Sequence, residues 1–501
     1  MSEGSSTQLG PGRWLVPSLG SLLGLVTLAN ALLFRSRHFF AVDGDVGRHI
    51  RVGRTILDNG VIPTTDLFSH TRQGARFVPY EWFSETLTAL VEIASGLPGV
   101  VVLSALLYCI AVFAIYRAAG ELGSRRIVGF FVAGLAMILQ SVHLLPRPHL
   151  FTTALAAVFV LVLIRFAKSG NTWTLAPLPP LMIVWANSHG GFLIGFILLA
   201  FFLTGALLRS VEFASPRRAV IPLLFTIAAC VAASLLNPAG ITLWTHTTGY
   251  LGIGFLVDAT QEYRSIDFHA GYGKLFFVGL LAGPIAWMTG RVRVSLLAAG
   301  LYLFFAATAL HSARNIPLFT VAVMPWLALW IAEVLESAGP RVQKVLDRLD
   351  KFEDVDRMLR PGASLLAAVA LVWFAVGPNH SAYKFDPQVF PVEAVSGLGT
   401  ENTHGNVFNQ LIWGGYLLYE RPDIPVFIDG QTDFYGEGLS REYLTALKGH
   451  AGWRSVLERY DISWTLLSAG EPLNQLLELD PEWHRTYSDN VATVYTRERT
   501  D

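Results

Sequence analysis

The sequence predicts a polytopic α-helical membrane protein, with about eleven transmembrane helices followed by a soluble α/β domain. Of its 501 residues, 52% are hydrophobic and 15% are charged, whereas a soluble protein usually carries about 25% charged residues. Long apolar runs recur up to residue 377 and then stop. This break predicts a membrane domain at 1–377, with a first outer loop at 35–97, and an extracytoplasmic α/β domain at 378–501.

The apolar runs locate the membrane spans, because a bilayer core needs about 20 apolar residues per helix. We expect spans near 14–34, 98–117, 127–144, 150–167, 173–187, 191–209, 219–236, 274–290, 294–311, 315–335 and 362–377. The first run lacks a small-residue cleavage site, so we interpret it as a retained span. The segment 80–97 could form an additional re-entrant or interfacial helix.

Basic residues in the short loops predict the orientation, because cytoplasmic loops carry an excess of Lys and Arg. With a cytoplasmic N-terminus, every short inside loop is basic. These loops contain Arg117, Arg125, Arg126, Arg165, Lys168, Arg209, Arg217, Arg218, Arg291 and Arg293. The first loop and the tail then lie outside a bacterial inner membrane. The segment 340–360 mixes apolar residues at helical spacing with alternating charges, which predicts an amphipathic helix on the inner surface.

Composition excludes two other classes of protein. The net charge of −1 offers no basic surface for nucleic acid. The two cysteines, Cys109 and Cys230, lie inside apolar runs, so a disulfide framework is not expected.

Polar residues gather at the outer helix ends, on the side that also holds all thirteen histidines under this topology. Ionisable groups at membrane depth are costly, so they usually face a cavity and mark function. The residues that we expect to bind substrate there are Arg48, His49, Arg147, His149, Asn187, His189, His311 and Arg314.

The first outer loop carries an acidic pair, Asp43 and Asp45, separated by one glycine. In an extended segment both carboxylates would point to one side. Such a pair can hold a divalent cation, or one member can act as a general base. Two alternatives remain open: Asp45 could cap the helix that follows, and Asp43 could join Arg48 and Arg51 in a surface ion-pair cluster.

Glu81 begins the amphipathic segment at 80–97 among aromatic residues. It is our third candidate catalytic carboxylate, although an acidic residue at a helix start is also favoured by the helix dipole.

Two arginines, one asparagine and one histidine on this face have competing interpretations. Arg147 and Arg314 suit an anionic phosphate headgroup, or they could extend to the membrane interface. Asn187 and His189 lie among small residues in WANSHGGF, where a structural hydrogen bond is as reasonable as a site role.

The tail alternates strand and helix patterns. Segments 406–408, 424–428 and ISWTLLS are predicted strands, SREYLTALKG and WRSVLERY are predicted helices, and RTYS with VATVYT could form a closing hairpin. Asp429 and Asp433 follow a predicted strand, where either a site role or a turn role is plausible.

Several segments resemble those of the GT-C superfamily of integral-membrane glycosyltransferases. They are DGDVGRHIRVGRTILDNGVIPTTDLFSH, YEWFSE, RPHLFT, WANSHGGF and IDGQTDFYG. The resemblance implies a sugar donor linked to polyprenyl phosphate, with Asp43 or Asp45 activating the acceptor or binding a divalent cation such as Mg or Mn. The tail segment WGGYLLYE is similar to the WWDYG-type acceptor motif of oligosaccharyltransferases, but Gly414 stands at its acidic position.

Two functions fit these observations. The first is an enzyme that transfers a sugar from a polyprenyl-phosphate donor to a glycan, lipid or protein acceptor at the outer face. The alternative is a non-catalytic transporter, flippase or envelope-assembly protein. A transporter would favour charged or broken helices at mid-depth and internal repeats. Here the polar groups lie at helix ends, which favours the enzyme.

Overall fold

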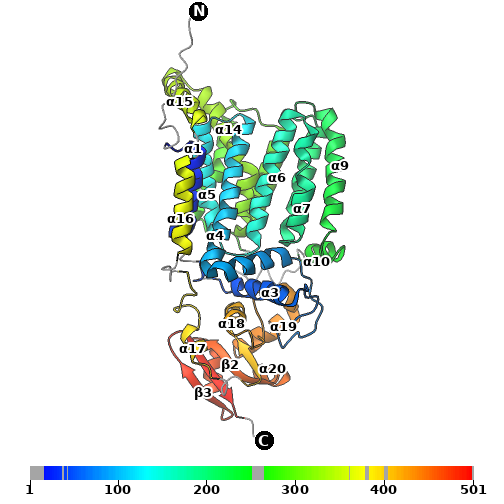
Figure 1. The fold of residues 1–501 in the computed structure, drawn as a ribbon, viewed down its shortest axis with the longest axis vertical. Helices are drawn as coiled ribbons and strands as arrows, with labels where there is room; N and C mark the ends of the chain where they lie inside the picture. The colour runs from blue at the N-terminus through cyan, green and yellow to red at the C-terminus, as the bar shows by residue number, and fades with distance from the viewer. Residues whose placement is uncertain are drawn as a thin grey trace, which may run out of the picture.

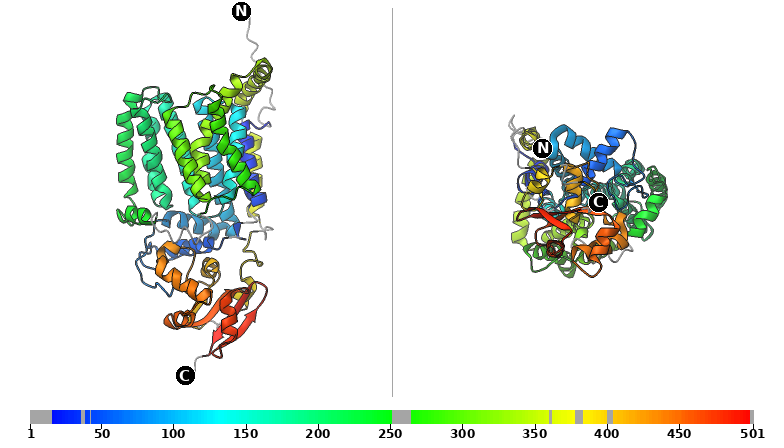
Figure 2. Two further views of the ribbon diagram at one scale, coloured as in Figure 1. Left: turned by 180° about the vertical axis from the view of Figure 1, so that it is seen from behind. Right: turned by 90° about the horizontal axis from the view of Figure 1, so that it is seen from below.

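A computed structural model describes residues 16–35, 39–41, 43–250, 264–359, 362–377, 383–399 and 404–498. Figure 1 shows three layers along the long axis, and the view from behind in Figure 2 shows the same order. A bundle of long helices forms the first layer, two helices lie across its lower end, and the C-terminal tail lies below them. Seen from below, the tail lies within the outline of the bundle (Figure 2).

Seven helices within the described ranges are long and apolar enough to cross a membrane. They are formed by α4 (Trp82–Leu122), α5 (Arg126–Gln140) with the 3-10 turn η3 (Ser141–His143), α6 (His149–Ser169), η5 (Gly190–Phe192) with α8 (Leu193–Leu207), α9 (Pro216–Ser234), α12 (Gly271–Met288), and η7 (Ala313–Asn315) with α14 (Ile316–Glu336). Three shorter apolar helices are α1 (Leu19–Ala29), which continues into η2 (Asn30–Arg35), α13 (Leu296–His311) and α16 (Gly362–Val376). The multi-pass helical fold is confirmed.

The predicted span at 173–187 is wrong in length. The chain there forms a short 3-10 turn, η4 (Thr172–Leu175), and then α7 (Leu178–Ala186), which has only 9 residues. Prolines at 177, 179 and 180 explain the interruption, because proline lacks the backbone N–H that a continuous helix needs.

The segment at 80–97 forms the first part of α4, which lies across the end of the bundle that faces the tail (Figure 1). The helix bends at Gly96, whose φ of 65° and ψ of −163° are not helical, and Pro98 follows. Glycine tolerates this positive φ because it has no Cβ. The additional helix expected at 80–97 is therefore present, and it is continuous with the span that follows it. The helix α3 (Asp45–Asn59) packs beside it.

The amphipathic helix expected at 340–360 is α15 (Pro340–Met358), at the end of the bundle opposite the tail (Figure 1). Its buried acidic side chains bind the starts of two spans. Asp356 accepts a hydrogen bond from the backbone N–H of Leu19 at 2.6 Å, and Glu353 accepts one from that of Ile127 at 3.0 Å. Free N–H groups at helix starts favour such acidic partners, so α15 is attached to the bundle.

The tail contains a mixed four-stranded sheet in the order β1-β2-β4-β3. Its strands are β1 (Asn406–Asn409), β2 (Ile462–Ser468), β3 (Trp483–Ser488) and β4 (Ala492–Arg497). The pair β1/β2 is parallel and the other two pairs are antiparallel. The tail helices are α17 (Val392–Gly397), α18 (Gly414–Glu420), α19 (Thr432–Leu447), α20 (Trp453–Arg459) and α21 (Pro472–Glu478). The predicted α/β class of the tail is confirmed.

The predicted strand at 424–428 is wrong. Val426 forms only an isolated bridge, with Ser69 of the first outer loop. Its N–H donates to the carbonyl of Phe68 at 3.0 Å, and its carbonyl accepts from His70 at 3.1 Å. The backbone groups that a sheet would use are taken by the outer loop, so this segment joins the tail to the membrane domain.

Glycines let α18 of the tail approach α3 closely. A Cβ added to Gly47 would lie 2.3 Å from the carbonyl oxygen of Gly415, and one added to Gly415 would lie 2.2 Å from that of Gly44. Real side chains do not tolerate such distances, so the two backbones are in direct contact. This contact fixes the tail under the start of α3.

Candidate active site at the tail end of the bundle

The acidic pair of the first loop meets Arg147, which lies just before α6. Arg147 binds both carboxylate oxygens of Asp43, through Nε to Oδ2 and through Nη2 to Oδ1 at 2.6 Å. Its Nη1 lies 3.1 Å from Oδ2 of Asp45. A guanidinium that holds a carboxylate through two donors is a strong and geometrically specific contact. The structure thus brings together three of the predicted site residues.

Asp43 and Asp45 have different environments. Asp43 is 1% exposed, and its Oδ1 also accepts a hydrogen bond from the N–H of Asp45 at 2.9 Å. The Asp45 and Arg147 side chains are 20% and 21% exposed, so a ligand can reach them. Burial raises the pKa of Asp45, although the positive charge of Arg147 opposes this shift. Asp45 is therefore a stronger base than an ordinary aspartate.

The capping alternative for Asp45 is wrong. The N-cap residue of α3 is Gly44, with no side-chain cap, and Asp45 lies in the first turn of the helix. The helix starts one residue earlier than the pattern indicated, because the Asp43 carboxylate accepts the Asp45 N–H.

A second cluster lies beside the first and joins α3 to the start of α4. His49 Nδ1 lies 3.1 Å from Glu85 Oε1 and 3.9 Å from Glu81 Oε2. Burial raises the pKa of Glu81 to about 8. Burial alone would lower the pKa of His49, but the hydrogen bond with Glu85 and the charge of Glu81 raise it.

These three residues could also hold a metal ion, because one ligand atom from each lies within 4.8 Å of the others. Glu85 Oε2 is buried and has no hydrogen-bond partner, which leaves a carboxylate oxygen available as a ligand. Sequence reasoning missed Glu85. Its spacing of four residues from Glu81 could have identified it, because such residues share one face of a helix.

Arg48 is enclosed by groups of the chain itself. Its Nε donates to Asp429 Oδ2 at 3.1 Å, and its Nη1 lies 3.6 Å from Glu85 Oε1. The ring centroids of Phe68 and Phe77 lie 6.0 and 5.6 Å from its guanidinium carbon. Arg48 therefore links the first loop to the tail. Like Glu85, Asp429 belongs to this region but is not among the residues that we predicted for the site.

His189 lies next to the Glu81 cluster, with its Nε2 3.9 Å from Glu81 Oε1. Its Nδ1 accepts a hydrogen bond from the N–H of Gly191 at 3.0 Å and lies 2.9 Å from the Thr152 hydroxyl. Burial, together with the positive charge of Arg314, lowers the pKa of His189 to about 3. The side chain is thus neutral, and Arg314 acts on the same region.

His149 and Asn187 make contacts that also serve the fold. The ring of His149 lies 4.4 Å from that of His143, and its Nε2 donates to the carbonyl of His143 at 2.8 Å. Asn187 Oδ1 accepts from Trp82 at 2.6 Å, and its Nδ2 donates to the Leu236 carbonyl at 2.9 Å. These contacts match the structural alternative for Asn187.

Among the described residues, His311 is not brought into either carboxylate cluster. Its side chain is exposed at the end of α13, and its backbone carbonyl accepts a hydrogen bond from Ser265 at 3.4 Å.

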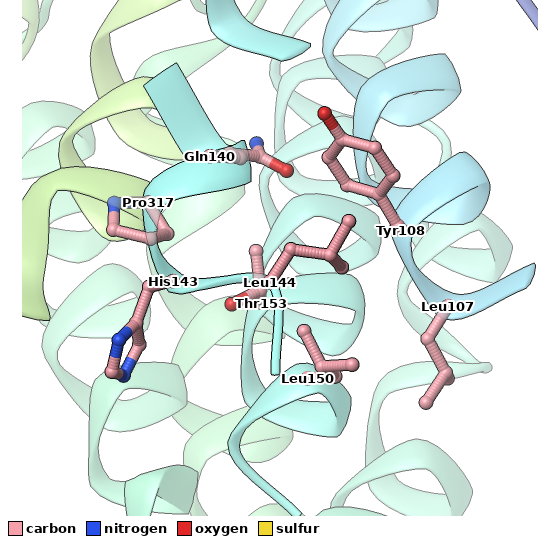
Figure 3. A pocket seen from close by; sticks show the side chains of 8 residues that line it. All are labelled: Leu107, Tyr108, Gln140, His143, Leu144, Leu150, Thr153 and Pro317. Atoms are coloured by element: carbon pink, nitrogen blue, oxygen red, sulfur yellow. The ribbon is translucent and has the colours of Figure 1, made fainter. Parts of the chain in front are cut away.

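A small cavity lies above His143, between α4, α5, α6 and α14. Figure 3 shows Gln140, Tyr108 and Pro317 around it. Its volume of about 10 Å³ is close to the minimum for a single water molecule. It is too small for a sugar or a phosphate, so we do not assign the substrate to it.

The tail forms the lower wall of the site. His246 Nε2, on α10 (Thr242–Tyr250), lies 3.3 Å from Asp433 Oδ2, and its ring lies 5.2 Å from that of Tyr80. A Cβ added to Gly430 would lie 1.7 Å from Asp45 Oδ1. The segment from Asp429 to Asp433 therefore lies against Asp45 of the first cluster and against Arg48, which lies 3.6 Å from Glu85 of the second.

Comparison with solved structures identifies the fold. ArnT from Cupriavidus metallidurans bound to undecaprenyl phosphate superposes with a TM-score of 0.53 and 16% identity, covering 98% of this chain and 99% of that one. The archaeal oligosaccharyltransferase AglB from Archaeoglobus fulgidus, in complex with an inhibitory peptide and a dolichol-phosphate, gives 0.53 and 13%, covering 96% and 74%. The mycobacterial arabinofuranosyltransferase AftD gives 0.54 and 13%, covering 100% and 41%. No protein-family model and no curated protein matches the sequence.

These similarities extend over nearly the whole chain. The protein has the GT-C fold that the sequence resemblance predicted.

Proposed function

We propose that this GT-C-fold protein is a glycosyltransferase that moves a sugar from a polyprenyl-phosphate donor to an acceptor at the outer face of the membrane. The observation that carries the proposal is the cluster of Asp43, Arg147 and Asp45. It offers one partly exposed carboxylate, that of Asp45, beside one partly exposed guanidinium, that of Arg147. Glycosyl transfer from a phosphate needs a base for the acceptor and a cation for the leaving phosphate.

In the proposed reaction, an acceptor hydroxyl oxygen attacks the anomeric carbon of the sugar. The bond between that carbon and the phosphate oxygen breaks, and its electron pair leaves with the phosphate. Asp45 takes the hydroxyl proton, because it is the more exposed carboxylate of the pair and its pKa is raised. Arg147 stabilises the charge that develops on the phosphate, and Asp43 holds Arg147 in place.

The donor class is supported by the comparison structures. The ArnT structure holds undecaprenyl phosphate and the AglB structure holds a dolichol-phosphate. By likeness to them, the phosphate of a lipid-linked donor would approach Arg147 from the membrane side. Arg314, whose charge acts on the neighbouring histidines, would contribute to the same positive field. A glycan, lipid or protein acceptor would enter from the tail side.

A divalent cation fits His49, Glu81 and Glu85 better than it fits the acidic pair of the first loop. Arg147 already occupies Asp43, whereas Glu85 Oε2 has no hydrogen-bond partner. One imidazole with two carboxylates is a donor set suited to divalent ions such as Mn²⁺. When bound, the cation would add positive charge near the leaving phosphate.

We propose a bacterial inner membrane as the location, with the N-terminus in the cytoplasm and the tail outside. The basic loops predicted to lie inside belong to the end of the bundle that carries α15, and the site lies at the other end. This arrangement agrees with the excess of Lys and Arg in cytoplasmic loops.

The test uses the full chain in lipid nanodiscs with a panel of undecaprenyl-phosphate sugars and envelope extract as the source of acceptor. Release of undecaprenyl phosphate is measured. Asp45→Asn should lower kcat by about 100-fold or more, the usual contribution of a general base. Asp58→Asn, an exposed position on the same helix, is the matched control and should keep full activity. Full activity of both Asp45→Asn and Asp43→Asn would refute the mechanism.

A further inference from the structure

Among the residues that the structure describes, the most deeply buried ion pair between the tail and the membrane domain joins Asp429 to Arg48. Asp429 is 1% exposed. Its Oδ2 accepts hydrogen bonds from Arg48 Nε and from the Tyr435 hydroxyl, each at 3.1 Å. Its Oδ1 accepts one from the N–H of Gln431 at 2.8 Å. The carboxylate is therefore held rigidly by its own segment and presents one charged contact to α3.

Arg48 depends on this contact. Its side chain is 4% exposed, so water does not replace a lost partner easily. Asp429 lies at hydrogen-bond distance from it, whereas Glu85 is farther away, at 3.6 Å. A buried cation with one close anionic partner is strongly destabilised when that partner is removed. Asp429 therefore sets where the guanidinium lies.

Glu85 in turn depends on Arg48 and His49. Its Oε1 lies 3.6 Å from Arg48 Nη1 and 3.1 Å from His49 Nδ1. Its Oε2 is buried and has no hydrogen-bond partner, so the described contacts hold this carboxylate through Oε1 alone. A displaced Arg48 would thus move Glu85, and Glu85 would move the imidazole that faces Glu81.

We propose that Asp429 is a positioning residue: acting through Arg48, it fixes the arrangement of Glu85, His49 and Glu81 from the tail side. The tail then helps to position the side chains of the site, in addition to any contact that it makes with an acceptor. The effect on activity rests on the proposed function, whereas the effect on the arrangement of the side chains does not.

The first experiment measures the arrangement without any activity assay. The full chain in nanodiscs is treated with diethyl pyrocarbonate, and the modification rate of each histidine is followed by peptide mass spectrometry. In Asp429→Asn, His49 should react about tenfold faster than in the wild type, the factor expected when one charge-assisted hydrogen bond is lost. His70, which bonds the Val407 carbonyl at 2.9 Å, reports contact between the first loop and the tail, and its rate should not change.

The control variant is Asp480→Asn. Asp480 is also a buried carboxylate of the tail, paired with Arg454 and bonded to the N–H of Glu482. The Asp480→Asn variant should leave the modification rate of His49 unchanged. Equal acceleration of His49 and His70 in Asp429→Asn would mean that Asp429 only attaches the tail, and an unchanged His49 rate would mean that Arg48 does not need it. Either result overturns the proposal.

The second experiment measures transfer, if the proposed activity is found. Asp429→Asn should lower kcat by about 10- to 100-fold, as for residues that orient groups of a site, with little change in KM for the lipid donor. In a Glu85→Gln background the same change should add nothing, because its route to His49 is already broken. Full additivity of the two changes would overturn the proposed route. Absence of activity in the wild type refutes the proposed function and leaves the histidine result standing.

Discussion

The ion pair between Arg54 on α3 and Glu92 on α4 gives a sharp test of how α3, α4 and the tail are held together. Arg54 makes three hydrogen bonds with Glu92, at 2.9, 2.7 and 2.6 Å. The Tyr419 hydroxyl of α18 donates to the same carboxylate at 3.0 Å, and the guanidinium lies 5.5 Å from the Tyr419 ring centroid. One pair thus joins α3, α4 and the tail.

The two partners differ in burial, and this difference sets the expected magnitudes. The Glu92 side chain is 4% exposed and that of Arg54 is 38% exposed. Arg54→Met leaves a buried carboxylate without its cation. Loss of one partner of a buried pair costs about 3–5 kcal/mol, and the partial exposure of Arg54 reduces this to about 2–3 kcal/mol. Glu92→Leu leaves a guanidinium that can reach water, so it should cost about 1 kcal/mol or less.

The assay is hydrogen–deuterium exchange of the amides in α18, which report local opening. A cost of about 2–3 kcal/mol corresponds to exchange about 30- to 150-fold faster in Arg54→Met. The double variant Arg54→Met, Glu92→Leu should return close to the Glu92→Leu rate, because no buried charge is left unpaired. If Arg54→Met exchanged at the wild-type rate, or if the double variant were worse than either single one, the reasoning from burial would be refuted.

Three further predictions follow from other contacts. Gly430→Ala should displace the Asp45 carboxylate and reduce transfer strongly, because its Cβ would lie 1.7 Å from Asp45 Oδ1. Gly438→Ala, with nothing within 4 Å of the added Cβ, should be neutral in the same transfer assay. Burial raises the pKa of Glu81 from 4.5 to about 8, so its stabilising contribution is complete below about pH 4.5 and is lost as pH rises through about 8. Glu81→Gln should therefore show a smaller fall in melting temperature than the wild type between about pH 6 and pH 9, measured with a chelator present. A reporter inserted at 170 should register in the cytoplasm and one joined after 498 should register outside, and the reverse result would overturn the orientation.

Membrane architecture was readable from the sequence because hydropathy is a local property. Runs of about 20 apolar residues can be placed in a bilayer with no knowledge of their neighbours. The main failure, at 173–187, came from prolines that shorten α7 within an apolar run. Amphipathic segments such as α15 were equally clear, because their periodicity is visible within a few turns.

Pairing between distant segments was not readable from the sequence. The strand expected at 424–428 has the right composition, yet its backbone pairs with residues of the first outer loop more than 350 positions away. Strand propensity describes how a residue fits a pleated surface and does not identify the partner. Arg48 and Asp429 present the same problem, because their contact spans 381 positions.

The sequence by itself determined the fold class, the predicted sidedness and the set of polar residues at the helix ends, including Asp43, Asp45 and Arg147. Only the tertiary structure decided which of them meet: Arg147 with the acidic pair, His49 with Glu81 and Glu85, and Arg48 with the tail. Hydropathy and composition are properties of neighbouring residues in the sequence, so a short stretch of sequence is enough to recognise them. Charge pairing depends on the separation of side chains in space, and the folded chain alone sets that separation.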